Sequence, residues 1–237
     1  MKIVVMDSGK GGLNLKKKIN KNRDVSFHKI FPELTSEKGW TKKYIRKGLL
    51  KILNNYDSKI VKNIIIACHS ASSTIMDILM KNYYRINNIK IYEPIVPACM
   101  YIKKKNYKNI LVLCTPITTR LKWHYKLLKK KGINVKYITF PYLAYRIDDG
   151  VNIMKYLKKI KKKEKFIEKC DCVVLGCTHY NVIKKEISSE LKKYKFNGEI
   201  IDTNEILYKY FKKNACLKKI KTRKKRRIRK RKTLKNK

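Results

Sequence analysis

Short apolar runs alternate along this chain with longer, lysine-rich segments in which apolar residues recur at helical spacing. Uninterrupted apolar runs are typical of strands buried on both faces, and amphipathic segments between them are typical of crossover helices. The chain is therefore predicted to be an α/β protein with parallel sheets. Strands are expected near 2–6, 25–31, 61–67, 89–92, 109–114, 134–139, 171–176 and 199–201. Helices are expected near 12–20, 40–55, 71–82, 96–104, 118–131, 151–163, 181–193 and 204–213.

Two cysteines end apolar runs in matching settings. Cys68 follows the run 64–67, Cys177 follows the run 173–176, and small polar residues come directly after each. Each thiol is expected in a strand-to-helix turn at the edge of a sheet where ligands collect. The start of a helix is expected to lower the pKa of a cysteine and increase its thiolate fraction. The pair predicts two similar halves that close over one small molecule, with one sulfur on each face.

A glycine-rich turn, Asp7-Ser8-Gly9-Lys10-Gly11-Gly12, follows the first predicted strand. Its glycines let the backbone approach a ligand closely, and amides at a helix N-terminus favour an anion. The turn has neither the G-x-G-x-x-G nor the G-x-x-x-x-G-K-[ST] pattern, and Asp7 would repel phosphate, so nucleotide binding is disfavoured. Asp7 suits an ammonium group or an acid–base role, and a tight turn capped by an aspartate is the structural alternative.

The other cysteines point to no disulfide framework and no metal. Seven cysteines are scattered along the chain, so reduced thiols are expected. Cys170, Cys172 and Cys177 lack paired C-x-x-C spacing and a nearby partner group, which disfavours a metal cluster. A Cys–His hydrolase would need one nucleophile and would leave the second thiol unexplained.

The charge of the chain is strongly basic, with 61 Lys and Arg, 17 Asp and Glu, and a net charge of +44. Residues 218–237 hold 14 of the basic residues and no acidic one, which predicts a disordered basic tail that contacts nucleic acid non-specifically. The alternative explanation for the high charge is compositional drift toward Lys, Asn, Ile and Tyr.

No apolar run approaches the roughly 18 residues of a membrane span, and no signal peptide is evident, so a cytoplasmic protein without membrane contact is expected.

These motifs together resemble those of the cofactor-independent glutamate racemases, in the aspartate/glutamate racemase superfamily. The turn at 7–12 is similar to the family's D-S-G-x-G-G, and 67–71 is similar to its A-C-N-T-A. The segment 175–180 reads L-G-C-T-H-Y, the most specific of the three, and its His179 indicates a glutamate and not an aspartate enzyme. Weaker similarities in the same order extend the resemblance over residues 1–212.

The resemblance implies two pseudosymmetric lobes, each a mostly parallel sheet flanked by helices, with the active site between them. It implies racemisation of glutamate without a cofactor: one thiolate removes the α-proton and the other thiol returns a proton on the opposite face. The product D-glutamate would supply peptidoglycan, and Cys68 is the expected base for the D-enantiomer. The implied catalytic residues are Cys68, Cys177, Asp7, His179 and Asp148. The implied substrate-binding residues are Asp7, Ser8, Lys38, Gly39, His69, Ser70, Thr118, Thr178 and His179.

Two positions depart from the family pattern. His69 stands where the family has Asn, and Lys38 aligns with a family Tyr. These changes leave a racemase of aspartate or another acidic amino acid as one alternative. The net charge and the basic tail leave a nucleic-acid-binding protein on a racemase scaffold as the other. A homodimer is compatible with either.

The hinge between the two lobes is expected at Glu93-Pro94, because proline disfavours a helical conformation in the residue before it. The expected domains are a first lobe over 1–94, completed by 203–217, a second lobe over 95–202, and the tail.

Overall fold

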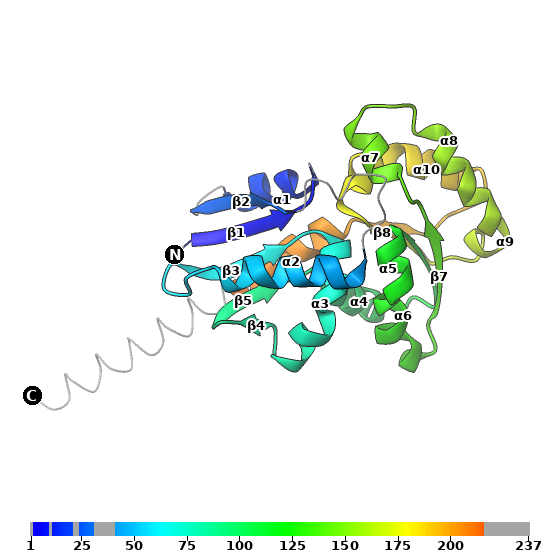
Figure 1. Cartoon of the computed structure of the whole chain (residues 1–237). Coiled ribbons are helices and arrows are strands. Elements are labelled where there is room, and N and C mark those ends of the chain that lie inside the picture. The colour runs from blue at the N-terminus through cyan, green and yellow to red at the C-terminus, as the bar shows by residue number, and fades with distance from the viewer. Residues whose placement is uncertain (1, 10, 21–23, 31–40, 216–237) are drawn as a thin grey trace, which may run out of the picture.

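The apolar runs form two β-sheets, which lie side by side in Figure 1. This computed structural model describes residues 2–9, 11–20, 24–30 and 41–215. The first sheet has the strand order β2-β1-β3-β5-β4, and the second has the order β7-β6-β8-β9. Within these ranges every strand pairing is parallel except that of β4 with β5. The predicted α/β class, with two mostly parallel sheets flanked by helices, is confirmed.

All eight predicted strands are present, and their ends lie within two residues of the expected positions. The first sheet consists of β1 (Lys2–Asp7), β2 (Val25–Lys29), β3 (Val61–Ile66), β4 (Arg85–Ile86) and β5 (Ile89–Tyr92). The second consists of β6 (Asn109–Cys114), β7 (Asn134–Thr139), β8 (Cys172–Gly176) and β9 (Glu199–Ile201). The runs that end at the two matching cysteines are β3 and β8, and β8 is buried along its whole length. Burial on both faces explains why these strands read as continuous apolar runs.

The helices follow the amphipathic segments. They are α1 (Gly11–Ile19), α2 (Lys42–Asn54), α3 (His69–Lys81), α4 (Ile95–Lys104), α5 (Pro116–Leu121), α6 (Trp123–Leu128), α7 (Leu143–Asp148), α8 (Met154–Leu157), α9 (Glu164–Ile167) and α10 (Lys184–Lys192). Short 3₁₀ helices are η3 (Lys129–Lys131), η4 (Lys158–Lys163) and η5 (Thr178–Asn181), and a final helix covers 203–215. In α2, Ile45, Leu49 and Leu53 recur every four residues and are all buried. Such spacing places them on one helix face.

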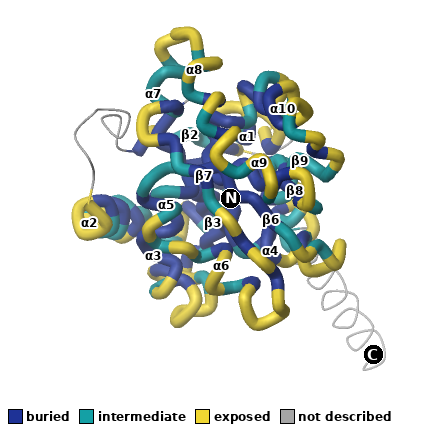
Figure 2. Tube along the Cα trace, turned by 90° about the vertical axis from the view of Figure 1, so that its right-hand side faces the viewer, coloured by how far each residue is buried: buried dark blue, intermediate teal, exposed yellow. Residues whose placement is uncertain are grey.

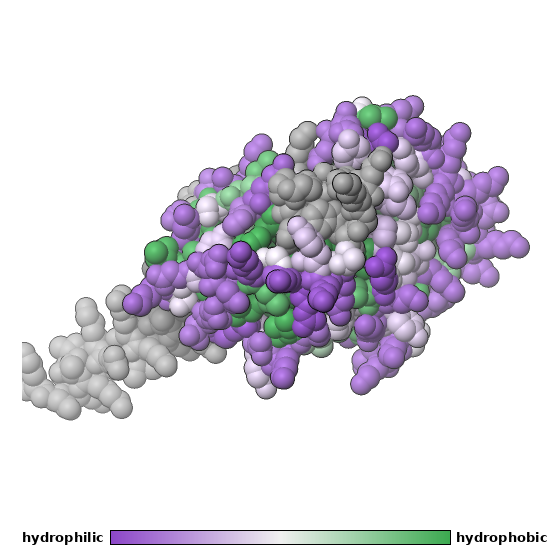
Figure 3. Space-filling model, viewed as in Figure 1, coloured by the Kyte–Doolittle hydropathy of each residue, from purple (hydrophilic) through white to green (hydrophobic). Residues whose placement is uncertain are grey.

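The two sheets share part of one apolar core. Ile64 and Ile66 of β3 belong to the same buried cluster as Val112 of β6 and Val174 of β8. Figure 2 shows buried strands inside and exposed helix surfaces outside, and hydrophilic side chains dominate the face in Figure 3. Within the described ranges, no helix has the length and apolar character needed to span a membrane.

The final helix returns to the first sheet after the chain has completed the second. Leu207 and Phe211 lie in one buried cluster with Val5 of β1 and Leu15 of α1. The Phe211 ring also meets the edge of the Tyr92 ring on β5, with centroids 4.9 Å apart. The helix is orange in Figure 1 and crosses behind α2. Residues more than a hundred positions apart therefore build one face of the first sheet.

Glu93 lies at the predicted hinge and begins α4. Its carboxyl oxygens accept hydrogen bonds from the amides of Ile95 (2.5 Å) and Val96 (3.0 Å), which are orphan donors at the start of the helix. Glu93 is almost fully buried, and burial raises its pKa to about 7, although these amides partly offset the effect. The assignment of 1–94 and 95–202 to separate lobes stays a prediction.

Three local features differ from the expectations. The predicted helix over 118–131 is interrupted, because Lys122 adopts a left-handed conformation (φ 51°) between α5 and α6. The predicted helix over 151–163 is largely 3₁₀, and α7 was not predicted. Asn87 and Asn88 both have positive φ (46° and 61°), as in a tight hairpin turn, and this turn adds β4 to the sheet edge.

Candidate active site

The two matching cysteines end their strands as predicted, each directly before a helix. Cys68 is the N-cap residue of α3, and Cys177 is the N-cap residue of η5. Both are nearly buried, with 6% and 7% of their surface exposed. The six cysteines in the described ranges are free thiols. The sheets turn their carboxyl edges toward each other, because the loop after β1 contacts the turn after β8.

Close backbone approach explains two glycines of the first turn. A Cβ at Gly9 would come within 2.2 Å of Nε2 of His179, and a Cβ at Gly11 would come within 2.5 Å of Cβ of Thr178. Real side chains do not tolerate such distances, so only glycine allows this contact. The glycine-rich turn of the first sheet is therefore seated directly on the Cys177 turn of the second.

Asp7 is fully buried beneath this contact. A Cβ at Gly12 would come within 2.3 Å of the Asp7 Cβ, so the third glycine makes room for the carboxyl group. Burial raises the pKa of Asp7, whereas the charge of His179 opposes the rise. Neither carboxyl oxygen has a hydrogen-bond partner of normal geometry within the described ranges. The amides of Ser8 and Gly12 and the hydroxyl of Thr178 also oppose the rise, so Asp7 is a buried acid in a polar setting, as suits a group that receives a proton or an ammonium.

Cys68 is protonated in this environment. Its Sγ lies 3.7 Å from Oγ of Ser8, which comes from the first turn. Burial raises the pKa of Cys68 to about 12, and the charges of Asp7 and Cys177 add to the rise. We expected the start of α3 to lower this pKa. That expectation is wrong for Cys68, because loss of water and a neighbouring carboxylate outweigh the helix terminus.

Cys177, His179 and Asp148 form a hydrogen-bonded chain. Nδ1 of His179 lies 3.7 Å from Sγ of Cys177, and its Nε2 lies 3.1 Å from Oδ2 of Asp148. Burial disfavours the charged imidazole, but the bonds to Asp148 and Cys177 raise the pKa of His179 well above its ordinary value. His179 is therefore an imidazolium held between a carboxylate and a sulfur.

A hydroxyl pair links the two halves on the other side of the thiols. Oγ of Ser70, on α3, lies 2.7 Å from Oγ1 of Thr115, which follows β6. Oγ1 of Thr118 lies 3.3 Å from the same Thr115 atom. Ser70 and Thr118 are thus brought together through Thr115, and their role in substrate binding stays a prediction. Thr115 was not among the predicted site residues, although the Thr-Pro sequence after a strand was a signal for it.

His69, which was predicted to bind substrate, contacts a second histidine. Its ring is stacked on that of His124 from α6, with centroids 6.0 Å apart and planes 15° apart. Both rings are buried. Sequence reasoning missed His124 entirely, because nothing in the order of residues links α3 with α6. The predicted residues Lys38 and Gly39, and the tail over 218–237, lie outside the described residues.

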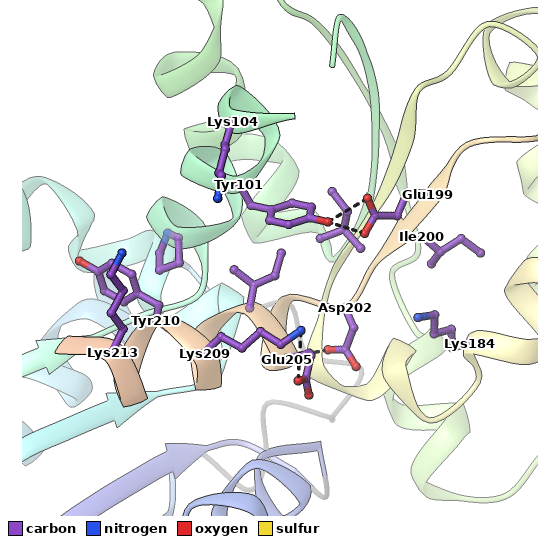
Figure 4. Close-up of a pocket in the computed structure, with 13 residues that line it drawn as sticks. Tyr101, Lys104, Lys184, Glu199, Ile200, Asp202, Glu205, Lys209, Tyr210 and Lys213 are labelled. Carbon is purple, nitrogen blue, oxygen red and sulfur yellow. Dashed lines mark hydrogen bonds and ion pairs between the residues drawn. The ribbon is translucent and has the colours of Figure 1, made fainter. Parts of the chain in front are cut away.

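A pocket of about 380 Å³ lies away from these residues, between α4, β9 and the helix over 203–215 (Figure 4). Its carboxylates are engaged within the protein. Glu199 accepts hydrogen bonds from the hydroxyl of Tyr101 at 2.9 and 3.1 Å, and Glu205 lies 3.6 Å from Nζ of Lys209. None of the predicted site residues lines this pocket, so it is separate from the candidate active site.

Comparison with known proteins shows the family to which this chain belongs. No family model matches the chain. The glutamate racemase of Aquifex pyrophilus, however, is 30% identical over 212 residues, which span 87% of this chain and 80% of that relative. The chain belongs to the glutamate racemase family. It is therefore an amino-acid racemase of the aspartate/glutamate racemase superfamily, as the sequence predicted.

Solved structures of glutamate racemases share this fold. The RacE1 isoform from Bacillus anthracis matches with a TM-score of 0.76 and 20% identity, over 91% of this chain and 82% of that one. The enzyme from Francisella tularensis, in complex with D-glutamate, matches with a TM-score of 0.75 and 21% identity, over 92% and 81%. The two-sheet arrangement described above is thus the glutamate racemase fold.

Proposed function

We propose that this racemase interconverts L- and D-glutamate with Cys68 and Cys177 as its two acid–base groups. The observation that carries the proposal is that both cysteines stand at the N-cap positions of helices at facing sheet edges, each beside a titratable partner. Asp7 acts on the pKa of Cys68, and His179 lies within 3.7 Å of Cys177. A racemase that works without a cofactor needs one group on each face of Cα, and two thiols meet that need.

Asp7 and His179 have complementary tasks in this mechanism. For Cys68 to act as a base, its proton must leave, and the Asp7 carboxylate beside it is the acceptor at hand. The His179 imidazolium, within 3.7 Å of Cys177, supplies a proton when Cys177 must be an acid. Asp148 holds His179 in this state, because its carboxylate stabilises the charged ring.

The substrate binds between the hydroxyl groups and amides that converge on the thiols. Ser8, Ser70, Thr118 and Thr178 offer hydroxyl groups to the two carboxylates of glutamate. Asp7, the buried carboxyl group beside Cys68, suits the ammonium group. The relative from Francisella tularensis is named as a complex with D-glutamate, which supports glutamate as the ligand here.

Exchange of the α-hydrogen tests this proposal. The protein is incubated with L-glutamate in deuterium oxide, and deuterium incorporation and optical rotation are followed together. Cys68→Ser and Cys177→Ser should each lower racemisation about 10³-fold, whereas Cys99→Ser, which changes an equally buried thiol on α4, should keep it. Absence of exchange with both glutamate and aspartate contradicts a racemase of either amino acid. Exchange with aspartate alone supports the alternative substrate.

We further propose that the enzyme acts in the cytoplasm and supplies D-glutamate for peptidoglycan. Family membership supports this role. A strain depleted of the protein should lose cell-wall integrity and regain it when D-glutamate is added. Failure of D-glutamate to rescue such a strain contradicts the role but not the activity.

A further inference from the structure

A pair of buried histidines lies outside the catalytic cluster, where α3 meets the second sheet's helices. His69 is the first residue of α3, directly after Cys68, and His124 belongs to α6. Their rings are nearly parallel, and only 1% and 0% of the two residues is exposed. The mechanism proposed above uses neither side chain.

The pair is poorly suited to packing alone. None of the four ring nitrogens has a hydrogen-bond partner within the described ranges, and the hydroxyl of Ser73, one turn along α3, has none either. A buried polar group without a partner costs about 1–3 kcal/mol. Apolar side chains of similar size would therefore hold the two helices together more strongly. The histidines need an explanation other than stability.

Both imidazoles are neutral in the folded protein. Burial lowers the pKa of His124 to about 4, and burial together with the charge of His124 lowers that of His69 well below its ordinary value. The other charged or titratable side chains on the neighbouring elements are Cys68, Asp77 and Lys81 at and on α3, Cys99, Tyr101, Lys103 and Lys104 on α4, Arg120 on α5, Tyr125 and Lys126 on α6, Lys136 and Tyr137 on β7, and Lys42, Lys43, Tyr44, Arg46, Lys47 and Lys51 on α2. Asp77 is the one carboxylate in this set, and it pairs with Arg46 at 2.8 Å. No carboxylate there compensates for a proton on either ring.

The N-terminal part of α3 makes two hydrogen-bonded contacts with α5 and α6, close along the helix to His69. Nε1 of Trp123 donates to the carbonyl oxygen of Ser73 at 2.8 Å. Oγ of Ser70 meets Thr115 at 2.7 Å. The His69–His124 stack lies with these two contacts along the same helix. A change in the stack therefore acts on the turn that carries Cys68.

We propose that His124 is a positioning residue for Cys68, which acts through His69: the neutral stack holds the Cys68 turn against the second half, and a proton on either ring releases it. This inference rests on the proposed function, since Cys68 is an acid–base group there. The open form takes up protons near the ordinary pKa of histidine, about 6.5. The closed form takes them up only at lower pH, so acidification favours the open form. Racemisation is then lost reversibly as the pH falls below the pKa of a free histidine.

Alkylation of Cys68 tests the positioning without any need for activity. Wild type and His124→Ala are treated with iodoacetamide at pH 8, and modification of Cys68 and Cys177 is followed by peptide mass spectrometry. Loss of the stack should raise the rate at Cys68 at least about tenfold, with Cys177 as the internal reference. An unchanged rate at Cys68, or an equal rise at both thiols, overturns the inference. These outcomes are independent of whether glutamate is racemised, so they separate failure of this inference from failure of the proposed function.

The pH profile of racemisation tests the proton. His124→Phe keeps an aromatic ring on His69 but cannot be protonated, so its loss of activity in acid should begin at lower pH than in wild type, whatever its activity at pH 8. His28→Phe changes a histidine that contacts Tyr56 outside this interface and should leave the acid limb in place. Coincident acid limbs in wild type and His124→Phe overturn the inference. A melting curve shows whether His124→Ala folds. If it does not fold, the pH profile of His124→Phe alone tests the inference.

Discussion

Gly9 lies so close to His179 that a methyl group at this position would meet Nε2 of the ring at 2.2 Å. The contact joins the turn after β1 to the turn after β8, and it leaves no room for the ring to move aside on the Asp148 side, where Oδ2 would lie at 3.1 Å from the same methyl group. The spacing of the two thiols across the site therefore depends on glycine, which has no side chain, at position 9.

Gly9→Ala should lower kcat/KM by about 10²-fold, because the alanine pushes His179 away from Asp148 or separates the two turns. Gly132→Ala is the matched control. A side chain is also unfavourable at Gly132, but only because of its backbone conformation (φ 66°), since its surroundings are open. It should cost about 1 kcal/mol of stability and keep activity at 25 °C. Equal activity of Gly9→Ala and wild type would contradict the contact.

Asp7→Asn should stabilise the protein while it removes activity. Burial disfavours the carboxylate, and Asn removes that charge in nearly the same volume. We expect a rise of about 2–4 °C in Tm at pH 8, with racemisation lowered by at least about 10²-fold. Calorimetry and the exchange assay measure the two effects. A fall in Tm would mean that the Asp7 carboxylate is stabilised by the fold.

Asp148→Asn should lower the pKa of His179, because a neutral amide cannot stabilise the imidazolium as the carboxylate does. The chain has four histidines, so their ring signals can be followed individually by NMR during a pH titration. Racemisation should fall about 10- to 100-fold at neutral pH. Asp149→Asn, which changes the next carboxylate along the chain, near Arg146 at 4.0 Å, should alter neither the His179 titration nor activity.

Glu93→Gln should change how stability depends on pH. The folded protein holds the Glu93 proton up to a pKa of about 7, whereas the ordinary value is 4.5. As the pH rises, the unfolded chain thus loses this proton before the folded protein does. The contribution of protonated Glu93 to the free energy of unfolding is therefore intact below pH 4.5 and lost as the pH rises toward 7. A difference of this size is worth about 3 kcal/mol. Urea unfolding should therefore show that the stability of Glu93→Gln relative to wild type increases between pH 4.5 and 7. Parallel pH profiles would refute a buried, protonated Glu93.

The strands were predictable because a strand buried on both faces leaves its mark in consecutive residues. The runs before Cys68 and Cys177 are cases of this kind, and the glycines at 9 and 11 carried their own signal. The roles of individual site residues stay predictions. The thiol pKa could not be judged from the start of α3 alone, because burial and Asp7 decide it.

Contacts between helices that are distant in the sequence could not be predicted from any pattern of consecutive residues. Lys122 interrupts the predicted helix with a left-handed backbone conformation, although apolar residues continue on both sides of it. The meeting of His69 with His124 likewise depends on how two helices are brought together by separate sheets. The hairpin that adds β4 was readable in principle from Asn87-Asn88, since paired asparagines favour positive φ.

The packing of the helix over 203–215 against the first sheet affects the order in which the protein can fold during translation. Leu207 and Phe211 emerge after every strand of both sheets, yet they complete the core around Val5 and Leu15. During synthesis the second sheet can assemble while the first still exposes an apolar face. The half that is made first is therefore the half that matures last, and it is the one that needs protection from aggregation until translation has passed residue 211.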